Sequence, residues 1–137
     1  MVKTLRQIVF SLFLSFNAFA GTPSPENAEL YFITPSDGDI VTSPVTVKFG
    51  LRNMGVAPAG VQVENTGHHH LLIDTDLPAL NQPVPKDNQH LHFGNGQTET
   101  ELGIAPGKHT LQLLLGDFSH VPHDPPLVSE KITITVE

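Results

Sequence analysis

Alternation of apolar and polar residues is the clearest pattern along most of the chain. In the segment 45–51 every second residue is apolar, from Val45 to Leu51. In the segment 132–136 two isoleucines and a valine alternate with threonines. A period of two places the apolar side chains of an extended segment on one face. Both segments are therefore predicted to be strands with one buried face.

Other short apolar segments recur between turn residues, and no helical period is found after residue 20. The prolines would also interrupt most helical windows. Residues 75–89 contain three prolines and no period, which predicts a long loop. The predicted strands are 29–33, 45–51, 56–63, 68–73, 98–104, 108–115 and 128–136.

This series of short strands predicts an all-β fold, namely an immunoglobulin-like antiparallel β-sandwich of about seven strands. A Greek-key barrel is the main alternative. The segment 35–47 is similar to the start of bacterial immunoglobulin-like domains. We expect a single domain over residues 29–137, preceded by a short polar leader over residues 21–28.

The first twenty residues have a different pattern. Lys3 and Arg6 precede an apolar run over residues 8–16, and Ala18-Phe19-Ala20 follows it. This is the order of a secretory signal peptide. A membrane anchor is the alternative, but a spanning helix needs about twenty apolar residues. We therefore predict cleavage after Ala20, no membrane span in the mature chain, and a periplasmic or secreted location.

Composition excludes several classes of protein. The chain has 14 acidic and 7 basic residues and a formal charge of −7, whereas a nucleic-acid-binding protein needs a basic face. It has no cysteine, which excludes disulfide scaffolds, thiolate zinc sites, iron–sulfur clusters and blue-copper sites. No serine lies in a nucleophile-elbow motif, so we predict no catalytic residues and favour a protein that is not an enzyme.

The 8 histidines suggest a metal site. Residues i and i+2 of a strand share a face, so an H-x-H pair offers two imidazoles to one ion. Imidazole ligands suit copper and zinc, and we expect copper first and zinc second. The candidate ligands form three pairs: His68 and His70, His90 and His92, and His120 and His123.

Topology favours convergence of two of these pairs. If the strands 68–73 and 108–115 run antiparallel, the start of the first lies beside the end of the second. His68 and His70 would then lie at the same rim as His120 and His123. His90 and His92 end the long loop and cannot be placed from the pattern.

Two functions fit these features. The first is a periplasmic metal-binding protein that sequesters or delivers copper or zinc. The second is a non-catalytic immunoglobulin-like interaction module of the cell envelope, with structural or pH-sensing histidines. Convergence of the histidines on a common point would favour the first. No protein partner can be named from the sequence.

Three motifs also resemble a known family. The first is Gly67-His68-His69-His70-Leu71-Leu72-Ile73-Asp74, the second lies within 92–99, and the third runs from Pro106 to His123. Together they resemble the bacterial family catalogued as domain of unknown function 4399, over about residues 45–136. The resemblance implies a small exported β-domain and assigns no activity to it.

Overall fold

The computed structural model describes residues 21–137, and the predicted signal peptide lies outside this range. The described chain contains nine strands and no helix. They are β1 (Glu29–Thr34), β2 (Ile40–Val41), β3 (Val45–Arg52), β4 (Gly55–Val56), β5 (Thr66–Ile73), β6 (His90–His92), β7 (Glu99–Leu102), β8 (Gly107–Gly116) and β9 (Ile132–Val136). Accordingly, no helix capable of crossing a membrane is found in residues 21–137.

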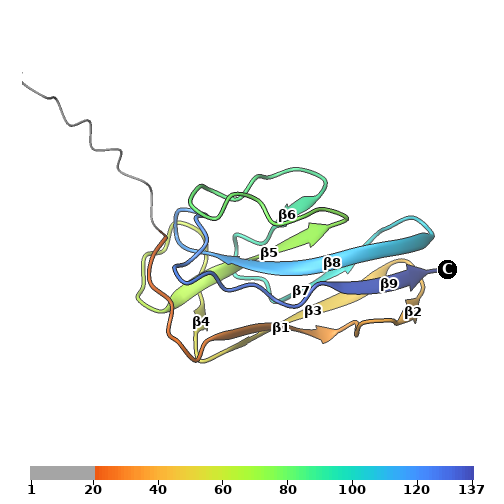
Figure 1. Cartoon of the computed structure of the whole chain (residues 1–137), viewed down its shortest axis with the longest axis horizontal. Helices are drawn as coiled ribbons and strands as arrows, with labels where there is room; N and C mark the ends of the chain where they lie inside the picture. The colour runs from red at the N-terminus through yellow and green to blue at the C-terminus, as the bar shows by residue number, and fades with distance from the viewer. Residues whose placement is uncertain (1–20) are drawn as a thin grey trace, which may run out of the picture.

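The strands form two sheets that lie as layers (Figure 1). The smaller sheet has the order β1-β3-β7, and both of its pairs are antiparallel. The larger sheet has the order β2-β9-β8-β5-β4, with β6 added to β5. Strand β8 runs antiparallel to both β5 and β9. The two-residue strands β2 and β4 run parallel to their partners, β9 and β5. The prediction of an all-β sandwich is confirmed.

The main core lies between the sheets and follows the period of two. In β3, Val45, Val47 and Phe49 are buried, whereas the residues between them are exposed. In β8, Leu111, Leu113 and Leu115 belong to the same core. Each such side chain contributes about 1.5–3 kcal/mol when it is fully buried. Hydrophobic burial therefore holds the two sheets together without a disulfide.

A second, smaller apolar cluster covers the opposite face of the larger sheet. It joins Leu72 of β5, Leu114 of β8 and Val84 of the long loop, with Val128 against them. The amide of Val84 also donates a hydrogen bond to the carbonyl of His120 at 2.9 Å. The loop 75–89 is thus anchored over this outer face, which explains why β5 is buried on both sides.

Some predicted strand boundaries were wrong. Of the predicted strand 56–63 only Val56 lies in a strand, β4, since Pro58 lacks an amide proton and Gly60 has a φ of 83°. The last strand begins at Ile132, not at residue 128. The short strands β2 and β6 were not predicted, because two or three residues carry no measurable period. The loop 75–89 contains no strand, as predicted.

Candidate metal centre

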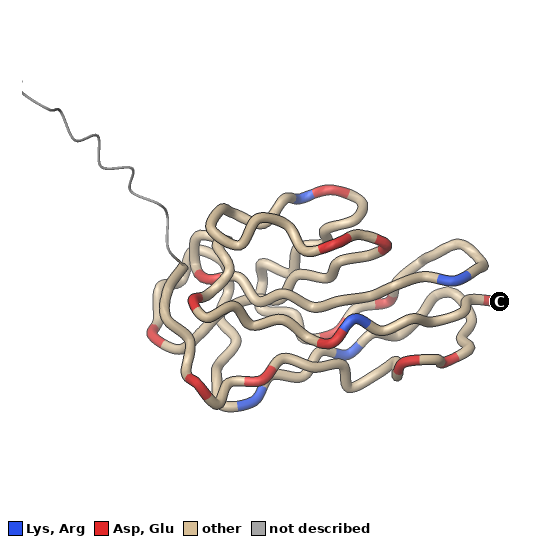
Figure 2. The backbone as a smooth tube through the Cα atoms, in the orientation of Figure 1, with Lys and Arg blue, Asp and Glu red and all other residues tan. Residues whose placement is uncertain are grey.

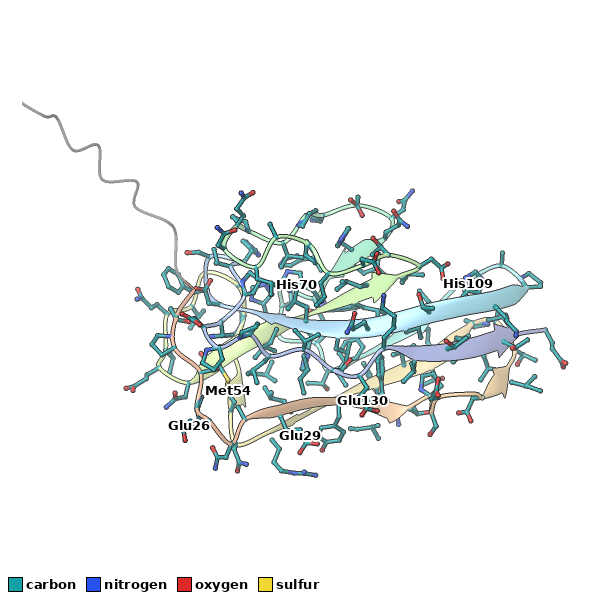
Figure 3. All side chains as sticks on the ribbon, viewed as in Figure 1. Glu26, Glu29, Met54, His70, His109 and Glu130 are labelled. Atoms are coloured by element: carbon teal, nitrogen blue, oxygen red, sulfur yellow. The ribbon has the colours of Figure 1, made fainter. Side chains whose placement is uncertain are left out.

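Four histidines converge on the outer face of the larger sheet. They are His68 and His70 of β5, His92 of β6, and His120 of the loop after β8. Each offers one ring nitrogen, and these four atoms lie within 4.8 Å of one another. Figure 3 labels His70 at this cluster and His109 well away from it, toward the other end of β8. Three separate parts of the sequence therefore present four imidazoles to one point.

The register of the sheet explains three of these positions. His68 and His70 are two residues apart on β5, so their side chains leave the same face. Strand β6 runs antiparallel to β5 and places His92 directly opposite His70. Directly paired residues of an antiparallel sheet have their Cβ atoms about 4.5–5.5 Å apart. The centroids of the His70 and His92 rings are accordingly 5.2 Å apart.

A turn built on Asp117 supplies the fourth histidine. Strand β8 ends at Gly116, which is paired with His68. The carboxylate of Asp117 then accepts hydrogen bonds from the amides of Ser119 and Val121, at 2.8 and 3.0 Å. This turn holds His120 in the left-handed region, with a φ of 67°. Its ring lies 3.2 Å from the ring of His68, measured between Nδ1 of His120 and Nε2 of His68.

Two glycines leave the space that the imidazoles fill. A Cβ atom on Gly116 would lie 2.7 Å from Cε1 of His70, and one on Gly94 would lie closer still to Cε1 of His92. Both distances are too short for any other residue unless the ring moves. These two positions are therefore part of the site even though they carry no ligand atom.

Burial keeps the imidazoles neutral. His68 and His70 are 0% and 1% exposed. Burial, with the neighbouring His120 and His92, lowers the pKa of His68 to about 4. Burial, with His68 and the other two rings, lowers the pKa of His70 to about 3. Burial also lowers the pKa of His92. Near neutral pH each of these three rings therefore has one nitrogen with a free lone pair, the form that binds a metal.

Several of the buried ring nitrogens have no hydrogen-bond partner within residues 21–137. They are Nδ1 of His68, Nδ1 of His70 and Nε2 of His92. A buried polar group without a partner costs about 1–3 kcal/mol. Most buried polar groups of native proteins have a partner, and within residues 21–137 the other buried side-chain atoms without one belong to His69, Gln112 and His123. A cation bound between the rings would give a partner to each unpaired nitrogen that faces it.

The donor set fits a divalent transition metal. Imidazole nitrogens bind zinc at about 2.0–2.1 Å, so two nitrogens on opposite sides of an ion are about 4 Å apart. The observed limit of 4.8 Å is close to that separation. Nitrogen ligands without thiolates or carboxylates suit copper and zinc better than calcium or magnesium. The site can therefore hold a metal ion with small movements of the rings.

Two of the six candidate ligands lie outside the cluster. Nδ1 of His90 donates a hydrogen bond to Asp87 at 2.8 Å, and His90 pairs with Leu72, two residues beyond His70 along β5. Nδ1 of His123 lies 3.0 Å from the hydroxyl of Thr22. Thr22 also joins this loop through its carbonyl, which accepts from the amide of Asp124 at 3.0 Å. The structure thus places His123 against the N-terminal residues of the described chain.

The remaining two histidines have other surroundings. His69 leaves the opposite face of β5 and packs in the main core, 5.0 Å from the ring of Phe49. His109 lies between Asp74 and the carbonyl of Ala105, 2.6 and 2.7 Å from its two ring nitrogens. Sequence reasoning missed Lys86 as a neighbour of the site. Its only signal was its position in a proline-rich loop close to His90 and His92.

A search of curated proteins and of solved structures gives no match to the chain. The profile of the family described as Domain of unknown function (DUF4399) matches residues 47–137. This range contains the four clustered histidines and both glycines beside them, as well as most of the strands. The match confirms the resemblance inferred from the three sequence motifs, and the chain belongs to the DUF4399 family.

Proposed function

We propose that this protein is an exported metal-binding protein that holds copper, or zinc as the second choice, between His68, His70, His92 and His120. The observation that carries the proposal is the convergence of four ring nitrogens within 4.8 Å, two from buried and two from half-buried histidines. Surface histidines rarely have this combination of burial and missing partners. The cost of burying neutral imidazoles without hydrogen bonds is offset when an ion binds to their lone pairs.

Copper is favoured over zinc by the chemistry of the donors. For a given set of nitrogen ligands, affinity rises along the first transition row to Cu(II) and falls again at zinc. The expected signal peptide would deliver the chain to a compartment where copper and zinc are encountered without strong thiol competition. The role that fits this location is sequestration or delivery of the ion in the periplasm.

An interaction module with structural histidines is the second candidate, and His69 is the observation that favours it. This residue is 0% exposed and neither of its ring nitrogens has a partner, although it lies on the core side of β5, away from the cluster. The fold thus tolerates at least one buried histidine for packing alone. The two candidates differ in whether the four-histidine cluster binds an ion.

Titration calorimetry of the purified protein with Cu(II) and with Zn(II) tests the proposal. We expect one ion per chain and tighter binding of copper. His70→Gln and His92→Gln should each weaken binding by at least about tenfold, which corresponds to about 1.4 kcal/mol. His109→Gln, outside the cluster, is the matched control and should bind like the wild type. Equal affinity in the wild type and in both cluster variants would contradict the proposal.

A further inference from the structure

The four-histidine cluster is closed on one side and open on the other. A cavity of about 290 Å³ is lined by His70, His92 and His120. His68 does not line this cavity and is 0% exposed, so its ring forms the back of the cluster. An ion held by the four nitrogens would therefore face protein on the side of His68 and free space on the other side.

The rest of the cavity wall comes from the long loop. Pro83, Val84 and Lys86 line it. Val84 is buried against Leu72 and Leu114, which fixes the position of the loop over the sheet. Lys86, two residues further on, is exposed, so this end of the cavity reaches the surface. The cavity thus connects solvent with the open side of the cluster, and a lysine stands at its mouth.

Within residues 21–137 the charge of Lys86 is not neutralised by an ion pair. Lys48, Arg52 and Lys131 each lie within 4.0 Å of a carboxylate, whereas Lys86 has no such partner within the described residues. The adjacent carboxylate of Asp87 accepts from Nδ1 of His90 and from the amide of Gln89. Acidic residues outnumber basic ones over the molecule (Figure 2). Lys86 nevertheless has no carboxylate partner among the described residues at the mouth of the cavity.

We propose that this cavity binds a small inorganic monoanion, which coordinates the ion on its open side while Lys86 supplies a countercharge. The inference rests on the proposed function, since it requires an ion between the histidines. The anion donates one lone pair to the ion, and no electron or proton is transferred. A water molecule takes about 30 Å³ of liquid volume, so the cavity has room for such an anion and several waters.

A cationic side chain at the mouth of this cavity would act on a bound anion mainly through its charge. Two unit charges about 7 Å apart in a water-like medium interact by roughly 0.6 kcal/mol, which changes an affinity about threefold. The effect should diminish as the salt concentration rises, because Lys86 is an exposed residue. The sign of the charge at residue 86, and not the shape of its side chain, should therefore determine the affinity for the anion.

Azide is a suitable probe, because its coordination to Cu(II) produces a charge-transfer absorption band. The copper-loaded protein is titrated with sodium azide at constant ionic strength. We expect a saturable band, with azide affinity about threefold lower in Lys86→Gln and about tenfold lower in Lys86→Glu. Lys86→Arg should bind azide like the wild type. Lys108→Gln, which removes another exposed lysine without an ion pair among the described residues, is the control.

The outcomes separate this inference from the proposed function. Copper binding without an azide band, or equal azide affinity in the wild type and Lys86→Glu, would overturn the inference and leave the copper site in place. Failure of the wild type to bind copper in calorimetry would overturn both. Copper affinity is measured for each variant, so that a lower azide affinity at full copper loading can be assigned to the cavity.

Discussion

His70 on β5 lies directly opposite His92 on β6, and both rings belong to the four-histidine cluster. Strand β6 has only three residues and follows a loop without other strands, so its pairing with β5 determines where His92 lies. Leu91, between the two histidines of β6, is paired with Leu71 and packs against the main core. Apolar packing on one side of β6 therefore positions a ligand on the other side.

The close approach of Gly116 to His70 gives the first prediction. In Gly116→Ala the new methyl group would lie 2.7 Å from Cε1 of His70, and the ring must move. A displacement of this kind separates one ligand from the other three. We expect copper or zinc affinity to fall by about tenfold or more, measured by calorimetry, which is about 1.4 kcal/mol.

Gly103→Ala is the matched control for this change. A Cβ atom at Gly103 would meet nothing within 4 Å, and Gly103 is not among the residues with positive φ. This variant should bind the metal like the wild type. If both alanine variants retain full affinity, the space beside Gly116 does not matter for the site.

Coupling between two pairs of histidines gives the second prediction. The double variants His68→Gln/His70→Gln and His92→Gln/His120→Asn should each lose most of the metal affinity. Asparagine is chosen at residue 120 because it tolerates the left-handed backbone found there. If all four histidines serve one ion, the quadruple variant should lose less than the sum of the two losses. Strictly additive losses, determined by calorimetry, would indicate separate sites.

Much of this site follows from periodicity, and the rest depends on loops. The placement of His68 and His70 on one face follows from their spacing on a strand. The approach of His120 follows from the antiparallel pairing of β5 with β8, since His68 is paired with Gly116 at the end of β8. The long apolar strand β8 likewise could be recognised from its composition.

The positions of His90 and His123 could not be predicted from residue spacing. The H-x-H spacing does place His90 and His92 on one face, but the register sets His90 over Leu72 and beyond the cluster. The spacing of His120 and His123 predicts a pair of ligands. The turn on Asp117 gives His120 a positive φ and directs the two side chains to different neighbours. The contacts of His120 with His68 and of His123 with Thr22 join distant residues and have no signature in local sequence.

The buried position of His69 gives the third prediction. Its two ring nitrogens have no partner among the described residues, and it packs against Phe49 in the main core. Replacement of such a group by an apolar side chain of similar volume removes its desolvation cost. His69→Leu should therefore raise the free energy of unfolding by about 1 kcal/mol in urea titrations without metal. Its metal affinity should equal that of the wild type, whereas a lower affinity would show that His69 assists the site.

The contact of His109 with Asp74 gives the fourth prediction, which concerns pH. Hydrogen bonding to Asp74 raises the pKa of His109, and the carbonyl of Ala105 adds to the effect. Partial burial opposes ionisation of Asp74, but the hydrogen bonds from His109 and from the amide of Thr110 outweigh it and lower the pKa of Asp74. The pair joins the end of β5 to β8, where the amide of Asp74 donates to Thr110.

The sign of the effect follows from these two shifts. Because the pKa of His109 is raised, its contribution to stability is fully present below its unfolded value of about 6.5 and is lost as pH rises through the folded value. Because the pKa of Asp74 is lowered, its contribution is present above about 3.9 and is lost as pH falls through the folded value. Both contributions are therefore present between about pH 4 and pH 6.5.

His109→Gln should accordingly destabilise the protein more at about pH 5.5 than at about pH 9. The measurement is the free energy of unfolding in urea for wild type and variant at both pH values, with a chelator present so that no metal contributes. Other titrating groups are common to both proteins, so they cancel in the difference. Asp74→Asn should show the same dependence, because it leaves His109 without its anionic partner. A difference between wild type and His109→Gln that is larger at pH 9 would mean that the imidazole does not act as a cation in this contact.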